Sequence, residues 1–145
     1  MKQPEPKPVD VADDMYRMHD HYGVHEVINK MTDTQLRALA EFRVNFLKEE
    51  LEEAAKSLEA GDAEEYVDAM IDLVVVAVGT LDLFGVDFRR AWNQVLAANM
   101  NKHVGVKPSR PNPLGLPDLV KPEGWTPPSH AHNHGFLVNA FEPQT

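Results

Sequence analysis

A short apolar segment that contains a carboxylate constrains the fold of this chain more than any other feature. Residues 70–78 (MIDLVVVAV) have the composition of a fully buried helical segment, yet Asp72 stands inside them. A lone buried carboxylate costs free energy and tends to become protonated, unless it faces a polar cleft or a divalent cation. We therefore expect the two helices over residues 46–79 to form a functional site around Asp72.

The sequence on either side of Gly61 predicts two consecutive helices. Thr32 and Gln35 have the spacing of a capping box, which begins a long helix that runs to about residue 60. Gly61 ends that helix, and Asp62 caps a second one that runs to about residue 84. Because the turn between them is short, we expect the two helices to be antiparallel neighbours.

Carboxylates occur on both of these helices at helical spacing. Counting outward from the turn brings acids of the two helices to about the same height, namely Glu50, Glu53, Asp68 and Asp72, with Glu49 and Glu65 nearby. An oxygen-only cluster suits hard cations such as Mg²⁺ or Mn²⁺. Two such ions can clamp a phosphoanhydride and lower the pKa of an attacking water. We expect a metal site here, with Glu49 or Glu50 as general base.

A simpler interpretation treats the same acids as a solvated helix face. Charge runs such as residues 48–53 usually have that role, and it is the position of Asp72 that favours a site. A di-iron carboxylate bundle would need Glu-x-x-His motifs, which these two helices lack. The alternating tail histidines, His130, His132 and His134, are expected to form a surface cluster.

Polar residues at other helix ends suit contacts with phosphate or a base. A fourth helix is expected from Phe88 to about Lys102, and Asn99 and Lys102 place an amide and a positive charge one turn apart. A short helix over residues 9–22 ends among aromatic and imidazole side chains, which are His19, His21, Tyr22 and His25. These can contact a base or sugar, but packing or capping is the favoured interpretation.

Composition narrows the class of protein. At 145 residues and 43% hydrophobic content the chain suits one globular domain, and its net charge of −9 argues against nucleic acid as a partner. The absence of cysteine excludes disulfides, thiolate zinc sites and a cysteine nucleophile. No apolar stretch reaches membrane-spanning length and residues 1–10 lack a signal-peptide core, so we expect a cytoplasmic protein without a membrane partner.

The expected fold class is all-α, a four-helix bundle core with an extended Pro-rich C-terminal tail. Residues 1–8 form a flexible arm, residues 9–104 the helical domain, and residues 105–145 an irregular tail packed on the bundle or on a neighbouring subunit. Eight prolines in the tail preclude long regular structure. No strand pattern is apparent.

Four ordered motifs resemble those of the MazG-like all-α nucleoside triphosphate pyrophosphatases. They are EELEE at 49–53, EYVD at 65–68, NMNK at 99–102 and KPEGWTPP at 121–128. The resemblance covers about residues 34–128, and the pattern from Asp68 to Thr80 resembles phage and some bacterial members. The superfamily includes dimeric dUTPases, dCTP pyrophosphatases and phosphoribosyl-ATP pyrophosphohydrolase.

The second motif can be aligned in two ways. Aligning on Gly79 puts Asp72 at the motif aspartate, and Asp68 then has to replace a glutamate whose position holds Ala69. Aligning on EYVD makes Asp68 the motif aspartate and Asp72 an additional acid. Whether Glu65 or Asp72 completes the metal site therefore stays open.

The resemblance implies hydrolysis of a (deoxy)nucleoside triphosphate between the α- and β-phosphates, which controls a nucleotide pool. It implies two or three Mg²⁺ or Mn²⁺ ions per site, held by Glu50, Glu53, Asp68 and Asp72, while Glu49 orients or deprotonates the water. It implies phosphate contacts from Asn99, Lys102, Arg43 and Lys121. Candidates for base stacking are Trp92, Trp125 and the segment around Tyr22. It also implies a homodimer or homotetramer, with sites completed across subunits.

The base of the substrate stays open. Within the resemblance, dGTP or GTP is the first substrate to test, and dUTP, dCTP or phosphoribosyl-ATP are the alternatives. A different class of function, a non-catalytic acidic helical scaffold, is also compatible with the acids.

Overall fold

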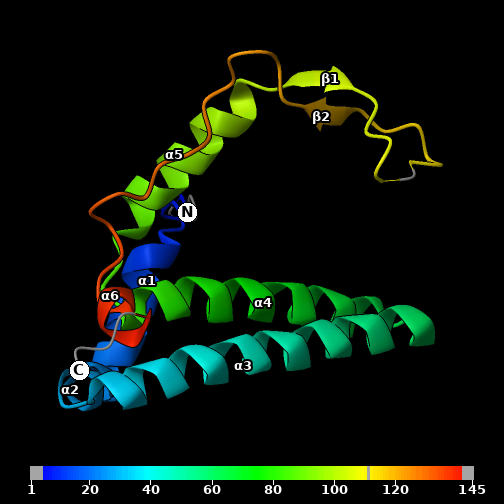
Figure 1. Ribbon diagram of the computed structural model, residues 1–145. Coiled ribbons are helices and arrows are strands. Elements are labelled where there is room, and N and C mark those ends of the chain that lie inside the picture. The colour runs from blue at the N-terminus through cyan, green and yellow to red at the C-terminus, as the bar shows by residue number, and fades with distance from the viewer. Residues whose placement is uncertain (1–4, 111, 142–145) are drawn as a thin grey trace. The chain divides into compact units, whose positions relative to one another are not determined.

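The computed structural model describes residues 5–110 and 112–141, and it is all-α apart from two three-residue strands (Figure 1). This confirms the expected fold class. The chain divides into two compact units: unit 1 is Met1–Phe88 with His134–Thr145, and unit 2 is Arg89–Asn133. The first half of the expected N-terminal arm and the last residues of the tail lie outside the described residues.

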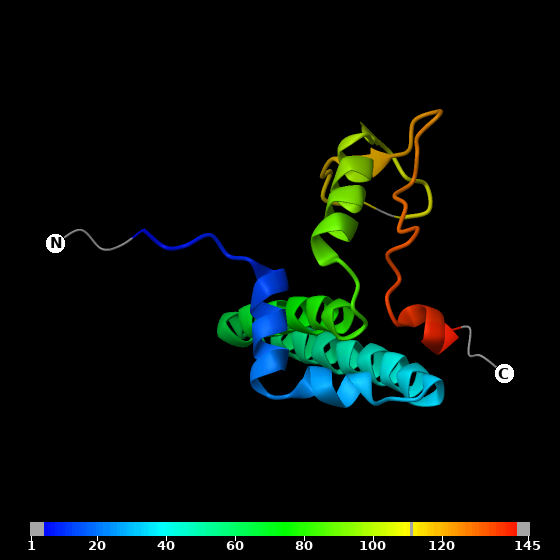
Figure 2. The same cartoon turned by 90° about the vertical axis from the view of Figure 1, so that its left-hand side faces the viewer.

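An antiparallel hairpin of two long helices dominates unit 1. Helix α3 (Asp33–Ala60) and helix α4 (Ala63–Leu83) lie side by side in both ribbon views (Figures 1 and 2). The predicted capping box is confirmed, since the Thr32 hydroxyl accepts from the Gln35 N–H while the Gln35 side chain accepts from the Thr32 N–H. Gly61 ends α3 at φ 67°, and Asp62 accepts from the Glu65 N–H to begin α4. Local hydrogen bonds of this kind are visible in the sequence, which is why both boundaries were predictable.

Two shorter helices precede the hairpin. Helix α1 (Val11–His21) begins at Asp10, whose side chain accepts from the Asp13 N–H, and it packs against α4. Gly23 at φ 69° separates it from α2 (Val24–Asn29), which the sequence analysis did not predict. Six residues are too few to show helical periodicity, so α2 depends on its packing against α1 and α4.

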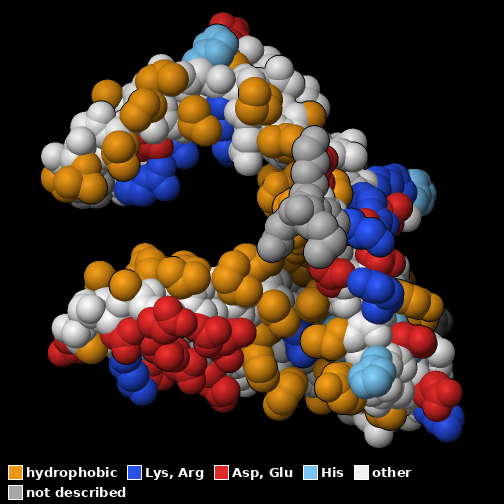
Figure 3. Space-filling view, turned by 180° about the vertical axis from the view of Figure 1, so that it is seen from behind, with side chains coloured by type: hydrophobic (Ala, Val, Ile, Leu, Met, Phe, Trp, Pro, Cys, Tyr) orange, Lys and Arg blue, Asp and Glu red, His pale blue; other side chains and the backbone are white. Residues whose placement is uncertain are grey.

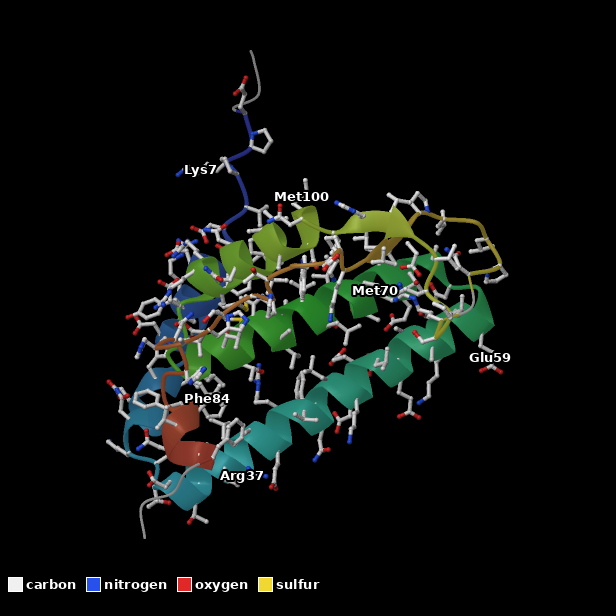
Figure 4. All side chains as sticks on the ribbon, turned by 45° about the horizontal axis from the view of Figure 1, so that its top comes forward. Lys7, Arg37, Glu59, Met70, Phe84 and Met100 are labelled. Carbon is white, nitrogen blue, oxygen red and sulfur yellow. The ribbon has the colours of Figure 1, made fainter. Side chains whose placement is uncertain are left out.

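The apolar core of unit 1 lies at the end of the hairpin away from Gly61. It contains the fully buried Phe84 with Ile28, Leu36, Leu83 and Ala140. Ala140 belongs to α6 (Leu137–Phe141), which lies beside the Phe84 end of α4 in Figure 4. The expectation of an irregular tail is therefore wrong for this segment. The Phe136 N–H donates to the Phe84 carbonyl at 2.7 Å, so α6 is held by a contact with a distant residue.

Unit 2 combines one helix with a small antiparallel hairpin. Helix α5 (Phe88–Met100) ends two residues before the predicted Lys102, and β1 (His103–Gly105) pairs with β2 (Asp118–Val120). The expectation that the chain has no strands is therefore wrong. Three-residue strands are too short to show the alternation that identifies a strand in a sequence.

The second part of unit 2 runs back along α5. The Trp125 indole N–H donates to the Ala98 carbonyl at 2.8 Å, and the Ser129 N–H donates to the Gln94 side chain at 3.1 Å. Arg90 donates to the Ala131 carbonyl at 2.9 Å. The proline-rich segment is thus ordered by contacts with the helix, although it has no regular structure of its own.

Candidate active site

Five carboxylates form one patch across the α3–α4 hairpin, which we call the acidic patch: Glu49, Glu50, Glu53, Asp68 and Asp72. Figure 3 shows the acidic side chains gathered on one face of the hairpin. Within the described part of the chain, none of the five makes an ion pair with lysine or arginine. The structure therefore brings the predicted acids together and leaves their charge uncompensated.

Glu50 lies at the electrostatic centre of the acidic patch. Desolvation raises the pKa of its carboxyl above the ordinary value of 4.5, and the charges of Asp72, Glu53, Asp68 and Glu49 raise it further. Its Oε2 atom is buried and has no hydrogen-bond partner. A buried oxygen without a partner among four other carboxylates is the environment in which a bound divalent cation compensates both deficits. The residues present therefore fit a hard cation.

Asp72 is half-buried, but its surroundings differ from the prediction. Met70, Ile71 and Val74 are 37%, 58% and 45% exposed, so the segment 70–78 is not fully buried within this chain. Within this segment Val76 and Val78 are buried, whereas Ala77 between them is exposed. The expectation of a carboxylate inside a wholly buried run is therefore wrong. Among the neighbouring charges, that of Asp72 nevertheless has the largest effect on the pKa of Glu50.

The two residues left open for the metal site lie in different surroundings. Glu65 is exposed near the start of α4, and its backbone N–H donates to Asp62. Its charge is not among those that shift the pKa of Glu50, whereas that of Asp72 comes first. Of the two, Asp72 is therefore the one whose charge acts on the pKa of Glu50.

Arg43 is a half-buried residue of α3. Its Nε–H donates to the Thr80 hydroxyl at 2.9 Å and its Nη2 to the Val76 carbonyl at 3.0 Å, so it links α3 to α4. Burial lowers the pKa of the guanidinium, which remains charged at neutral pH. Arg43 therefore has a structural role in joining the helices, and phosphate binding would be an additional one.

Unit 2 brings two of the predicted phosphate contacts together around an aromatic ring. The ammonium groups of Lys102 and Lys121 lie 5.4 and 5.0 Å from the ring centroid of Trp125. Asn99 is exposed one turn before Lys102, and Trp92 is 56% exposed. The tail residue Lys121 and the helix-end residue Lys102 thus form one positively charged group, which sequence spacing did not predict.

A separate group of three ligand-bearing side chains lies elsewhere in unit 1. Among the described residues, His19, His25 and Asp82 bring one ligand atom each to within 4.8 Å of the others. The carboxylates of the acidic patch do not form such a close group. Like charges that face each other without a cation are expected to spread apart. Asp82 was not predicted as a site residue, although it stands between Leu81 and Leu83 and is thus a carboxylate among apolar residues, as Asp72 is.

Comparison with known protein families matches the part of the chain that contains the acidic patch. The family model described as phosphoribosyl-ATP pyrophosphohydrolase matches residues 23–99, which include the whole acidic patch and Asn99. Lys102, Lys121 and Trp125 lie beyond the match. No curated protein matches the chain. Among the described helices, none is both long enough and apolar enough to cross a membrane.

Proposed function

The chain belongs to the phosphoribosyl-ATP pyrophosphohydrolase family, within the MazG-like all-α nucleoside triphosphate pyrophosphatases, and on this basis we propose that it hydrolyses a (deoxy)nucleoside triphosphate to the monophosphate and pyrophosphate. Family membership supports a pyrophosphohydrolase as the class of enzyme. The observation that carries the proposal is the acidic patch, in which the buried Glu50 oxygen has no partner.

In the proposed mechanism Glu50, Glu53, Asp68 and Asp72 hold Mg²⁺ or Mn²⁺, two or three ions per site. When bound, these ions neutralise the charge that develops on the phosphates and lower the pKa of a bound water. Glu49 neighbours these residues and is exposed, so it can accept the proton of the attacking water. Water is added across the α–β phosphoanhydride, so one of its P–O bonds breaks and the products are the monophosphate and pyrophosphate.

The positively charged groups have the role of binding phosphate in this proposal. Asn99, Lys102 and Lys121 are the phosphate-binding candidates of unit 2. Arg43 is the candidate of the hairpin. Both lysines lie against the ring of Trp125, so a base that stacked there would compete with them. Trp92 and Tyr22, which are 56% and 74% exposed, are the other candidates for stacking on the base.

The substrate base is the finer part of the proposal. We test dGTP and GTP first, and dUTP and dCTP as alternatives. Phosphoribosyl-ATP is the second candidate substrate, because the matching family model carries that description. The non-catalytic scaffold is the alternative of a different class.

The decisive experiment measures pyrophosphate release from dGTP, GTP, dATP, dCTP, dUTP, dTTP and phosphoribosyl-ATP with Mg²⁺ or Mn²⁺. The test variant is Glu53→Gln, and the matched control is Glu59→Gln, an exposed acid of the same helix outside the patch. We expect release from one or two substrates, lost in Glu53→Gln and on chelation but kept in Glu59→Gln. If none of the substrates releases pyrophosphate, the enzyme proposal is wrong and the scaffold alternative replaces it.

We also propose that the protein acts as a homodimer or homotetramer. The supporting observation is an apolar stripe on α4, in which Val67, Ile71 and Val74 are 62%, 58% and 45% exposed. These residues recur at the spacing of one helix face. Val67 and Ile71 directly precede Asp68 and Asp72 in α4, so a partner subunit on this stripe would lie near the acidic patch. Figure 3 shows hydrophobic side chains beside the acidic ones on the hairpin.

A further inference from the structure

A polar cluster lies near the C-terminal end of α4, ten positions beyond Asp72 and therefore about 15 Å along the helix. His19 of α1 and His25 of α2 both contact the same oxygen of Asp82, which we call the His–Asp cluster. The distances to Asp82 Oδ2 are 2.7 Å from His19 Nδ1 and 2.8 Å from His25 Nε2. His19 is buried, and Asp82 and His25 are partly buried, with side chains 14% and 22% exposed.

From this geometry we propose that the His–Asp cluster binds a divalent transition-metal ion such as Zn²⁺. Its three potential ligand atoms lie within 4.8 Å of one another, so small side-chain movements bring them to one ion. Two imidazoles and one carboxylate favour zinc, cobalt or nickel over magnesium, which prefers oxygen ligands. This site differs from the acidic patch in both position and ligand chemistry, and the inference does not depend on the proposed enzyme activity.

The second nitrogen of His25 supports a metal rather than hydrogen bonds alone. When His25 donates from Nε2 to Asp82, its neutral ring leaves Nδ1 without a proton, and Nδ1 is buried without a hydrogen-bond partner. The nearest carboxylate oxygen is Asp20 Oδ1, 3.9 Å away. If Nε2 instead binds a cation, the proton resides on Nδ1, and a side-chain movement that closes the 3.9 Å gap would let Nδ1 donate it to Asp20. A carboxylate that accepts from a metal-bound imidazole is a common arrangement in zinc sites.

The surroundings of the cluster both position the ligands and admit an ion. The His19 ring packs on the backbone of Gly79, where an added Cβ would lie 3.3 Å from His19 Cε1. His25 and Asp82 line a pocket of about 430 Å³ together with Tyr16, Asn29 and Phe136. The Tyr16 ring lies 4.7 Å from that of His25. An ion can therefore reach the ligands from this pocket, with an open coordination position for water.

The expected consequence of binding is stabilisation of unit 1. The three ligands come from α1, α2 and α4, so one ion would link three helices. An ion that binds only the folded chain raises its unfolding temperature in proportion to the logarithm of its concentration above the dissociation constant.

The test titrates the intact chain with Zn²⁺ and Co²⁺ in excess Mg²⁺, which competes with them for the oxygen ligands of the acidic patch. To remove the tail histidines, His130, His132 and His134 are replaced by Gln in the background of every sample. We expect one Co²⁺ per chain with visible absorption of a nitrogen-ligated site, and a rise in unfolding temperature with Zn²⁺. His25→Gln and Asp82→Asn should each weaken Zn²⁺ binding at least tenfold, and Asp20→Asn by about tenfold.

The control is His21→Gln. His21 is an exposed histidine of α1, the helix that carries His19, and it lies outside the cluster. It should bind Zn²⁺ like the background chain. Circular dichroism of the metal-free variants separates loss of a ligand from loss of the fold. If Asp82→Asn fails to fold, His25→Gln still decides the question. Absence of one-to-one binding, or equal affinity in His25→Gln, would show that the cluster is a set of hydrogen bonds only.

Discussion

At the scale of single residues, the chemistry of the hairpin centres on Glu50. Its carboxyl is surrounded by four other acids and has one buried oxygen without a partner. A raised pKa means that the folded state holds the proton of Glu50 more tightly than the unfolded state does. The stability that results is fully present below the ordinary pKa of 4.5 and is lost as pH rises through the raised value.

We predict that Glu50→Gln stabilises the metal-free protein at neutral pH and removes part of the loss of stability with rising pH. The amide cannot ionise, so its desolvation and repulsion do not grow above the ordinary pKa of Glu50. Urea unfolding in a chelator between about pH 4 and pH 7 measures this difference. With Mg²⁺ added, the order should reverse, because the variant lacks a ligand.

The matched control for this prediction is Glu59→Gln, which removes the same charge from an exposed position of α3 (Figure 4). Its stability should follow the pH dependence of the original chain. Equal pH profiles for Glu50→Gln and Glu59→Gln would mean that net charge, and not the acidic patch, sets the dependence.

At the scale of elements, unit 1 depends on glycines whose φ angles are positive but whose surroundings differ. Gly61 ends α3 at φ 67° and faces open space. Gly135 precedes α6 at φ 52°, and a Cβ there would lie 1.9 Å from the Phe84 carbonyl oxygen. The first position requires only a permissive backbone. The second also requires that no side chain come between α6 and the end of α4.

Alanine at each of these glycines separates the two requirements. Gly61→Ala should cost about 1 kcal/mol, the usual penalty of a left-handed conformation for a residue with a Cβ. Gly135→Ala should cost several times more, because the added carbon displaces the Phe136–Phe84 hydrogen bond and with it the packing of α6. Chemical unfolding of both variants measures the difference, and equal losses would show that α6 does not stabilise the core.

At the scale of the whole molecule, the exposed stripe of Val67, Ile71 and Val74 is an apolar helix face that suits association between chains. Segment 70–78 has the composition of a buried helix, but this chain covers only part of it. Association of two copies through α4 would remove the stripe from water, at about 25 cal/mol for each Å² of apolar surface buried. The apolar composition of segment 70–78 is then explained, because a second copy covers the residues that one chain leaves exposed.

We predict that Ile71→Glu reduces the molar mass of the protein in solution to that of one chain, or of a smaller assembly. A charge in the middle of an apolar contact must be desolvated without a partner, which opposes association. Multi-angle light scattering provides the mass. The control is Val27→Glu, since Val27 of α2 has a similar exposed fraction, 59%, and lies off the hairpin. A monomeric original chain would contradict the prediction.

The helices α3 and α4 and their capped turn could be predicted from the amino-acid sequence, because hydrogen bonds between near neighbours encode these elements. Helical spacing also brought Glu49, Glu50 and Glu53 of α3 to the same face as Asp68 and Asp72 of α4. The positions of α2, α6 and the strands were decided by tertiary contacts such as Phe136 on Phe84.

The His–Asp cluster also required the tertiary structure. Its hydrogen bonds join residues that are 63 and 57 positions apart, and no local spacing relates His19 or His25 to Asp82. Likewise, only the folding of the tail along α5 brings Lys121 to the ring that Lys102 contacts. Patterns within one or two helical turns predict helices and the faces they share, whereas contacts between distant segments depend on how those helices pack.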